Sequence, residues 1–132
     1  MKRPQHERKK TIEELLFVDD DLGLLGLYQL ELSEEGYQVI VAKDGKEALR
    51  KFEEESPDLV VMDICLPAED GMETLAAMLG KKRQVPVILN TAFPQYRENF
   101  MTWRTDAYLL KSSDLTELKK KIHEIFEKGK KR

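Results

Sequence analysis

The sequence has one cysteine, Cys65, and no apolar run that could cross a membrane as a helix. A single cysteine excludes an internal disulfide and a structural zinc site built on several cysteines. A membrane helix needs about 20 mostly apolar residues, and no segment of this chain approaches that length. The basic amino terminus also lacks the apolar segment of a signal peptide. We therefore expect a protein of a reducing compartment, the cytoplasm, without membrane insertion.

Histidine is also scarce, since only His6 and His123 are present. Neither has neighbours at the spacing of metal ligands, so the sequence predicts no histidine metal site. No internal repeat is visible, and no low-complexity segment lies outside the charged ends. A chain of 132 residues favours one domain, and at this size folding buries roughly two thirds of the unfolded surface.

The formal net charge of −3 conceals two basic ends. Residues 1–11 carry five basic residues and one glutamate, a net charge of +4, and residues 128–132 carry another +4. The remaining residues, 12–127, therefore carry −11. We predict basic tails at 1–11 and 128–132 around a domain at 12–127. Because that domain is acidic, we do not expect it to bind the phosphate backbone of a nucleic acid.

Short apolar runs alternate with helical patterns along residues 14–127, as in an α/β fold with a parallel sheet. The predicted strands cover 15–18, 37–42, 59–62, 85–89 and 107–110. The predicted helices begin at 22 and 45, cover 71–80, lie within 95–103, and begin again at 113 or 114. Strands that are apolar at every residue are typical of a sheet covered by helices on both faces.

Local signals support these helices. Asp21 is a predicted N-cap, Gly36 a C-terminal glycine, Asp44 begins a turn into the second helix, and Pro57 ends the pattern that follows. The residues predicted to face the sheet are Leu22, Leu25, Tyr28 and Leu32; Ala48, Leu49 and Phe52; Met72, Leu75, Ala76 and Leu79; and Leu115, Leu118, Ile122, Ile125 and Phe126.

Polar residues stand where four of the strands end. Asp19 and Asp20 follow the first strand, Asp63 the third, Thr91 the fourth and Lys111 the fifth. The carboxyl ends of parallel strands form the ligand-binding edge of an open α/β sheet. Three carboxylates at one edge repel one another unless a cation joins them, and oxygen ligands suit Mg²⁺ or Mn²⁺. With a lysine and a hydroxyl for phosphoryl oxygens, the set predicts phosphoryl transfer to a carboxylate.

Each of these residues alone has an ordinary structural explanation. An Asp-Asp pair after a strand is usually a turn and a helix cap, and a single lysine before a helix is usually surface decoration. Their joint occurrence at strand ends in one alternating chain carries the functional prediction.

The chain also resembles the receiver domain of two-component response regulators. The motifs that carry the resemblance are LLFVDDD at 15–21, DGKEAL at 44–49, PDLVVMDICLP at 57–67, DGME at 70–73, VPVILNTA at 85–92 and DAYLLK at 106–111. The resemblance implies a flavodoxin-like (βα)5 fold, a doubly wound parallel sheet with strand order 2-1-3-4-5.

The resemblance also implies residue roles. Asp63 would accept a phosphoryl group from a histidine kinase or a histidine phosphotransfer protein. Asp19 and Asp20 would hold Mg²⁺, with Asp63 and the backbone carbonyl of Cys65 as further ligands. Lys111 would pair with the Asp63 carboxylate or with its phosphoryl group.

A conformational switch is implied as well. Thr91 would move toward the phosphoryl group and Tyr108 would follow it inward. The signal would reach an output protein through the face formed by helix 4, strand 5 and helix 5. By resemblance the protein is a switch that assists its own phosphorylation and dephosphorylation rather than an enzyme, and a monomer or a weak phosphorylation-dependent dimer.

Two alternatives to the phosphoacceptor switch stay open. Ser112 follows the lysine where the family usually has proline, which mildly favours a pseudo-receiver that binds partners without phosphorylation. The other alternative is a phosphohydrolase, but such enzymes commonly have a second carboxylate two residues after the nucleophile, where this chain has Cys65.

Overall fold

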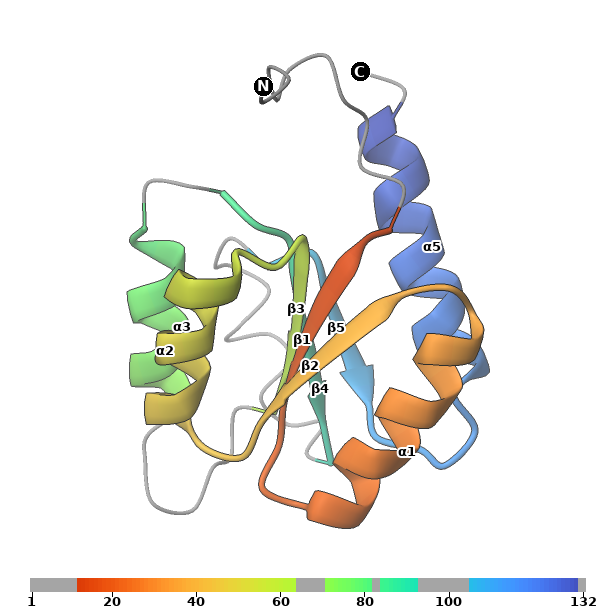
Figure 1. Cartoon of the computed structure of the whole chain (residues 1–132), viewed down its shortest axis with the longest axis horizontal. Helices are drawn as coiled ribbons and strands as arrows, with labels where there is room; N and C mark the ends of the chain where they lie inside the picture. Colours follow the sequence, from red (N-terminus) through yellow and green to blue (C-terminus); the bar gives the residue numbers. More distant parts are fainter. Residues whose placement is uncertain (1–11, 64–70, 82–83, 93–104, 131–132) are drawn as a thin grey trace, which may run out of the picture.

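The structure is a computed structural model that describes residues 12–63, 71–81, 84–92 and 105–130 (Figure 1). These residues contain one five-stranded parallel sheet with the order β2-β1-β3-β4-β5. The strands are β1 (Glu14–Val18), β2 (Gln38–Ala42), β3 (Leu59–Met62), β4 (Val87–Thr91) and β5 (Ala107–Leu110). The helices are α1 (Leu22–Glu34), α2 (Gly45–Glu55), α3 (Gly71–Leu79) and α5 (Thr116–Lys130). The predicted fold class and strand order are confirmed.

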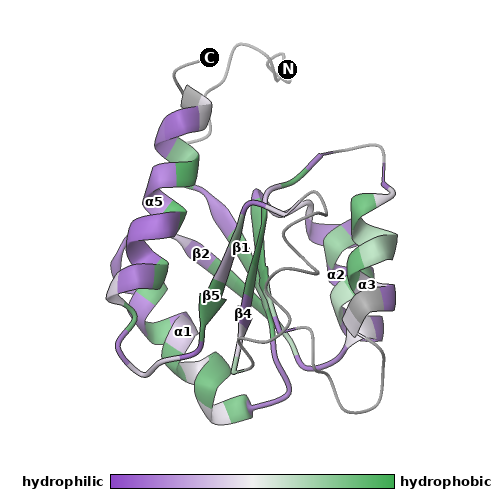
Figure 2. Ribbon diagram, turned by 180° about the vertical axis from the view of Figure 1, so that it is seen from behind, coloured by the Kyte–Doolittle hydropathy of each residue, from purple (hydrophilic) through white to green (hydrophobic). Residues whose placement is uncertain are grey.

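Helices cover both faces of the sheet. Helices α1 and α5 lie on one face, and α2 and α3 lie on the other (Figures 1 and 2). Successive strand residues point to opposite faces, so Leu16 and Val18 pack toward α2 and α3 while Leu15 and Phe17 pack toward α1 and α5. This arrangement explains why β1, β3 and β4 are apolar along most of their length.

The predicted helix ends have the expected geometry at three places. The Asp21 carboxylate accepts a hydrogen bond from the Leu24 backbone N–H at 3.1 Å, so Asp21 caps α1. Asp44 caps α2 in the same way through the Glu47 N–H at 2.8 Å. Gly36 follows α1 with φ of 101°, a left-handed conformation that a residue without a Cβ adopts at little cost.

The largest differences from the predicted boundaries are in β4 and α5. Strand β4 begins at Val87 rather than at 85 and continues through Thr91, so Thr91 belongs to the strand. Helix α5 begins at Thr116 rather than at 113 or 114, because the Asp114 carboxylate accepts the Thr116 N–H at 3.0 Å in a tight turn before the helix. This helix runs to Lys130, so residues 128–130 of the predicted basic tail are helical.

Two predicted inward positions were also wrong. Leu22, the first residue of α1, is 66 % exposed because the helix starts beyond the end of the sheet. In α3 the buried residues include Thr74, Leu75 and Met78, whereas Ala76 is exposed, so the helix presents a different stripe to the sheet.

Some expectations lie outside the described residues. They are the short helix within 95–103, the tail at 1–11, the Cys65 carbonyl and the side chain of Met72. In the described part of the chain, no helix combines the length and the apolar character that a membrane crossing requires.

Candidate functional site

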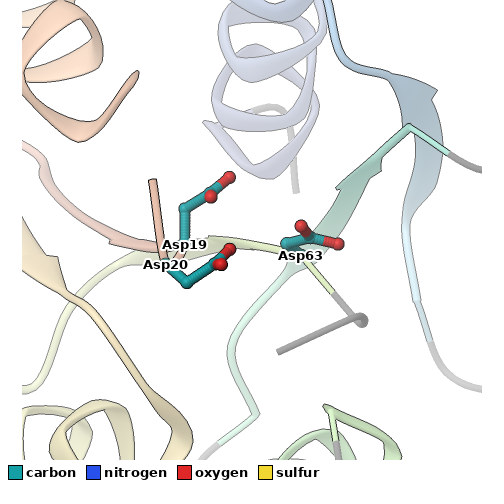
Figure 3. A group of neighbouring side chains, drawn as sticks. All are labelled: Asp19, Asp20 and Asp63. Carbon is teal, nitrogen blue, oxygen red and sulfur yellow. The ribbon is translucent and has the colours of Figure 1, made fainter. Parts of the chain in front are cut away.

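Three carboxylates meet at the carboxyl edge of the sheet. Asp19 and Asp20 follow β1 and Asp63 follows the neighbouring strand β3, and each offers an oxygen within 4.8 Å of the others (Figure 3). Asp19 and Asp63 are buried, whereas Asp20 is exposed. The sequence-predicted acidic cluster therefore forms, with two of its members inside the protein and one open to solvent.

Backbone hydrogen bonds hold the two buried aspartates in place. The Asp19 N–H donates to the carbonyl of Ala42 at the end of β2, at 3.1 Å, and the Asp63 N–H donates to the carbonyl of Val18 at 3.0 Å. The Asp19 side chain also accepts the Asp21 N–H at 3.0 Å. The backbone of both aspartates is thus tied to neighbouring strand ends.

Lys111 joins these two carboxylates. Its Nζ lies 2.8 Å from Asp19 Oδ2 and 2.7 Å from Asp63 Oδ2. The lysine follows β5, and its backbone N–H donates to the carbonyl of Thr91 at 2.8 Å. Because β4 separates β5 from β3 in the sheet, the side chain spans the end of β4 to reach both acids.

Lys111 contacts both acids although the residue that follows it is Ser112 rather than proline. No cis peptide bond occurs in the part of the chain that the structure describes, so the bond between Lys111 and Ser112 is trans. With Ser112 in the place of the usual proline, the Lys111 ammonium still contacts both acids.

The pocket perturbs the protonation of its members. Burial raises the pKa of Asp19, although the hydrogen bond from Lys111 works in the opposite direction. Burial also works to lower the pKa of Lys111, but its hydrogen bonds to Asp19 and Asp63, together with their charges, prevail and raise that pKa above its ordinary value. The lysine is therefore a cation throughout the physiological pH range.

The residues present fit a divalent cation that prefers oxygen. Three carboxylates face one another at close range, and the exposed Asp20 leaves the cluster accessible from solvent. Mg²⁺ is typically bound by a few carboxylates while it retains several waters. Cys65, whose carbonyl is the other expected ligand, lies outside the described residues.

The two predicted switch residues lie in the strands next to the pocket, Thr91 at the end of β4 and Tyr108 within β5. Thr91 is the last residue of β4 and is completely buried. Tyr108 lies in β5 with 6 % of its surface exposed, paired in register with Leu89, and it belongs to the core cluster on the α2–α3 face. The side chain of Tyr108 is thus inside the protein in this structure.

Sequence reasoning missed one buried polar pair. Asn90 Nδ2 donates a 2.7 Å hydrogen bond to the Tyr28 hydroxyl, and both side chains are buried. Tyr28 was expected only as part of the inner face of its helix. The available signal was Asn90 itself, an amide next to a run of apolar strand residues.

The fold and the site together define a class: an open parallel α/β protein with an acidic cluster and a lysine at its ligand-binding edge. The family model described as "Response regulator receiver domain" matches residues 15–123. The chain belongs to this family.

Curated relatives are longer than this chain. The transcriptional regulatory protein TrcR of Mycobacterium tuberculosis is 37% identical over 106 residues, which cover 79% of this chain and 41% of that protein. The alkaline phosphatase synthesis transcriptional regulatory protein PhoP of Bacillus subtilis is 42% identical over 80 residues, covering 61% of this chain and 33% of that protein. The matched segments span a third to a half of the length of such relatives.

Solved structures agree over almost the whole length of the domain. The response regulator protein TrrA of Thermotoga maritima in complex with Mg²⁺–BeF has a TM-score of 0.80 and 38% identity, covering 86% of this chain and 98% of that one. A CheY-like receiver domain protein of Methanospirillum hungatei has a TM-score of 0.84 and 29% identity, covering 92% and 98%. TrrA has also been solved with the histidine kinase ThkA, with a TM-score of 0.77 and 38% identity over 86% of this chain and 97% of that one.

Proposed function

We propose that this receiver domain accepts a phosphoryl group on Asp63, with Mg²⁺ held by Asp19, Asp20 and Asp63. The observation that carries this proposal is the contact of Lys111 Nζ with both Asp19 and Asp63, at 2.8 and 2.7 Å. A lysine that contacts the two buried acids of the cluster supplies the positive charge that a transferred phosphoryl group requires.

In the proposed step, an Asp63 carboxylate oxygen attacks the phosphorus of a phosphohistidine. The O–P bond forms as the P–N bond breaks, the imidazole leaves with the electron pair, and it takes up a proton. Lys111 stays close to the acceptor and pairs with the phosphoryl oxygens after transfer. Bound Mg²⁺ supplies further charge neutralisation at these oxygens. The product is a mixed anhydride, a hydrolysable acyl phosphate.

A histidine kinase or a histidine phosphotransfer protein is the proposed donor. The support is that TrrA, which is 38% identical to this chain, has been solved in complex with the histidine kinase ThkA. The Mg²⁺–BeF complex of TrrA supports the proposed cofactor, and Mn²⁺ has the same preference for oxygen ligands.

The proposed output is a conformational switch rather than turnover of a substrate. Thr91 is adjacent to the pocket through its carbonyl bond to the Lys111 N–H, and Tyr108 lies on the strand that leads to Lys111. Movement of Thr91 toward the phosphoryl group would change the packing around Tyr108, which is already buried, and the change would be read by a protein partner on the β5–α5 side.

The test is incubation of the chain with acetyl phosphate and Mg²⁺, followed by intact-mass measurement. We expect the wild type to gain one phosphoryl group and the Asp63→Ala variant to gain none. The Asp44→Ala variant, which changes an aspartate at the neighbouring strand end, should gain it as the wild type does. No gain by the wild type, together with no binding of a beryllofluoride mimic, would favour the pseudo-receiver instead.

A further inference from the structure

A buried polar pair joins α1 to β4 on the α1–α5 face of the sheet, near the acidic pocket. Tyr28 is 1 % exposed and Asn90 is 5 % exposed, and the hydrogen bond between them measures 2.7 Å. The ring of Tyr28 also stacks on Phe17 of β1, with centroids 4.7 Å apart. The hydroxyl is close enough to the pocket for Asp19, Lys111 and Asp63 to influence its pKa, which burial raises to about 12.

The pair connects a helix to a strand that the pocket depends on. Tyr28 belongs to α1, which starts immediately after the Asp19–Asp20–Asp21 segment, and Asn90 belongs to β4 next to Thr91. The Thr91 carbonyl accepts the Lys111 N–H, and the Lys111 ammonium returns to Asp19. The Tyr28–Asn90 bond therefore connects α1 to β4, the Thr91–Lys111 bond connects β4 to the lysine, and the Lys111–Asp19 contact leads back to the segment before α1.

The Tyr28–Asn90 hydrogen bond is a polar contact between α1 and β4. All five residues of β4 are buried, and Asn90 is the one amide among them. A buried amide that loses its hydrogen-bond partner costs about 1–3 kcal/mol. The Tyr28 hydroxyl, on a ring that is stacked on Phe17, therefore helps to set the position of the Asn90 side chain.

We propose that Tyr28 and Asn90 are positioning residues, whose buried hydrogen bond fixes the end of β4 against α1 and so holds Lys111 in contact with Asp19 and Asp63. Its consequence for phosphoryl transfer rests on the function proposed above, whereas its consequence for the placement of Lys111 does not. Asn90 stands on β4, next to the strand that leads to Lys111, while Asp19 and Asp63 follow β1 and β3 and are held there by their own backbone hydrogen bonds. Loss of the bond should therefore affect Lys111 before it affects the acidic cluster.

The first measurement is the labelling rate of Lys111 by acetic anhydride, followed residue by residue through peptide mass spectrometry in the full chain. The variants are Tyr28→Phe, which keeps the ring, and Tyr28→Phe with Asn90→Leu, which removes both polar groups and avoids a buried amide without a partner. Tyr37→Phe is the matched control, because Tyr37 is also a packed tyrosine of this face and contacts Phe126 rather than the pocket.

We expect Lys111 to be labelled about 5-fold faster in both Tyr28 variants than in the wild type, which corresponds to about 1 kcal/mol, the net value of one hydrogen bond. Labelling in Tyr37→Phe should proceed at the wild-type rate. The double variant is decisive, because it removes both the Tyr28 hydroxyl and the Asn90 amide and leaves neither without its partner. If its Lys111 is as protected as in the wild type, the pair is only structural and the proposal is wrong.

The second measurement separates rate from metal binding. At saturating Mg²⁺, we expect phosphorylation of the double variant by acetyl phosphate to be about 5-fold slower, with the Mg²⁺ dissociation constant from calorimetry changed less than about 2-fold. Equal losses in rate and in Mg²⁺ affinity would contradict the proposal. A wild type that gains no phosphoryl group would refute the proposed function alone, since the labelling result still decides whether the pair positions Lys111.

Discussion

Two neighbouring strand ends use the same local chemistry for different purposes. After β1, Asp21 caps α1 through the Leu24 N–H, and after β2, Asp44 caps α2 through the Glu47 N–H. Both turns carry further acids. In the first turn, Asp19 is buried and binds Lys111 from the far end of the domain. The second turn has no comparable long-range partner among the contacts described for it.

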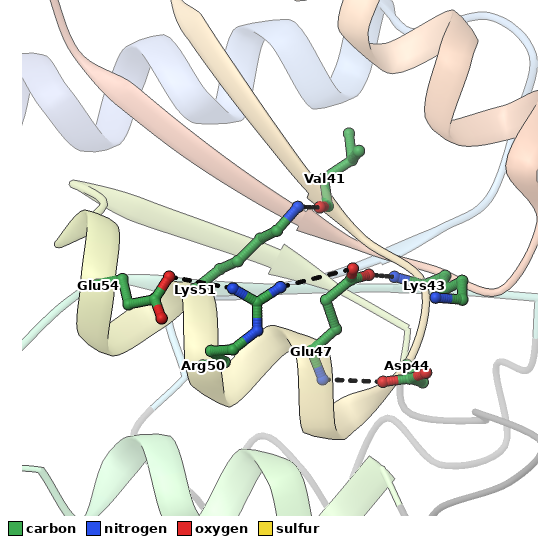
Figure 4. Close-up of polar contacts among 7 residues, drawn as sticks. All are labelled: Val41, Lys43, Asp44, Glu47, Arg50, Lys51 and Glu54. Carbon is green, nitrogen blue, oxygen red and sulfur yellow. Dashed lines mark hydrogen bonds and ion pairs between the residues drawn. The ribbon is translucent and has the colours of Figure 1, made fainter.

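Glu47, the further acid after β2, has only partners that are close in sequence among the contacts described for it. Glu47 Oε1 accepts the Lys43 N–H at 2.8 Å, and its other oxygen lies 3.9 Å from Arg50, which also pairs with Glu54 at 3.0 Å (Figure 4). The lysine of this region, Lys51, donates to the backbone carbonyl of Val41 at 2.7 Å. These contacts stabilise α2 and its attachment to the neighbouring strand β2.

The position of each strand in the sheet accounts for the difference. β2 is an edge strand, whereas β1 lies between β2 and β3, where the chain order reverses. Ligand sites of open α/β sheets form at such reversals because the connections leave in opposite directions and expose the strand ends. An aspartate pair after a strand therefore becomes a site only where a second acidic strand end, here that of Asp63, lies alongside.

The largest expected effect contrasts Asp19→Asn with Asp44→Asn. Removal of the charge at Asp19 should lower Mg²⁺ affinity by at least about 10- to 100-fold, a loss that even groups behind metal ligands can cause. Asp44→Asn should leave the affinity unchanged, because amide and carboxylate oxygens both cap helices well. Calorimetric titration with Mg²⁺ measures both, and equal affinities in the two variants would refute the assignment of the site to β1.

The second prediction contrasts the two lysines. Breaking a buried ion pair costs about 3–5 kcal/mol, and since the Lys111 side chain is 19% exposed we expect Lys111→Met to lose about 2 kcal/mol of unfolding free energy. Lys51→Met should lose about 1 kcal/mol, the value of one hydrogen bond. Urea denaturation measures both losses.

Mg²⁺ distinguishes the two lysine variants further. Because Lys111→Met leaves two buried carboxylates without their cation, Mg²⁺ should stabilise this variant more than it stabilises the wild type. Lys51→Met should respond to Mg²⁺ as the wild type does. An identical response of Lys111→Met would show that lysine and metal do not share the same carboxylates.

The third prediction concerns pH and the inner faces of the two helices. Helix α1 buries a tyrosine, Tyr28, whose pKa is about 12. At the inner face of α2 the buried aromatic residue is Phe52, which has no ionisable group. A folded-state pKa above the ordinary value of about 10 means that the unfolded chain loses this proton first. Stability should therefore fall as the pH rises from 10 to 12, by about 3 kcal/mol for this group, since each of the two pKa units corresponds to about 1.36 kcal/mol.

Tyr28→Phe removes this contribution. Denaturation midpoints measured from pH 8 upward should fall less steeply in the variant than in the wild type, and the two curves should be parallel below pH 9. Parallel curves over the whole range would show that Tyr28 titrates normally and is not buried as described.

The smallest expected effect tests the feature that the two turns share. Asp21→Ala and Asp44→Ala should each cost about 1 kcal/mol, the usual cost of losing an N-cap. Ser substituted at either position should recover most of the loss. Thermal denaturation of the four variants measures this, and a cap loss several times larger at one turn would show that its aspartate has a further structural role.

Much of the fold was predictable because its signals are local. Apolar runs, the caps Asp21 and Asp44, and the positive φ of Gly36 each depend on interactions within a few residues. The predictions that were wrong concern features that depend on contacts outside a few neighbouring residues or on competing local hydrogen bonds. The inner stripe of α3 depends on how the helix rests on the sheet, and the start of α5 depends on the Asp114 side chain competing with the helix for the Thr116 N–H.

For the site, the sequence by itself determined which chemical groups stand at the strand ends and in what order. Only the tertiary structure decided which of them meet, because strand adjacency and not sequence distance brings Asp63 beside Asp19 and carries Lys111 across β4 to both. The same holds for Tyr28 and Asn90, two polar residues in apolar patterns whose contact across the sheet face has no local signal. A helix cap needs one turn of chain, whereas a pocket of this kind needs the whole sheet.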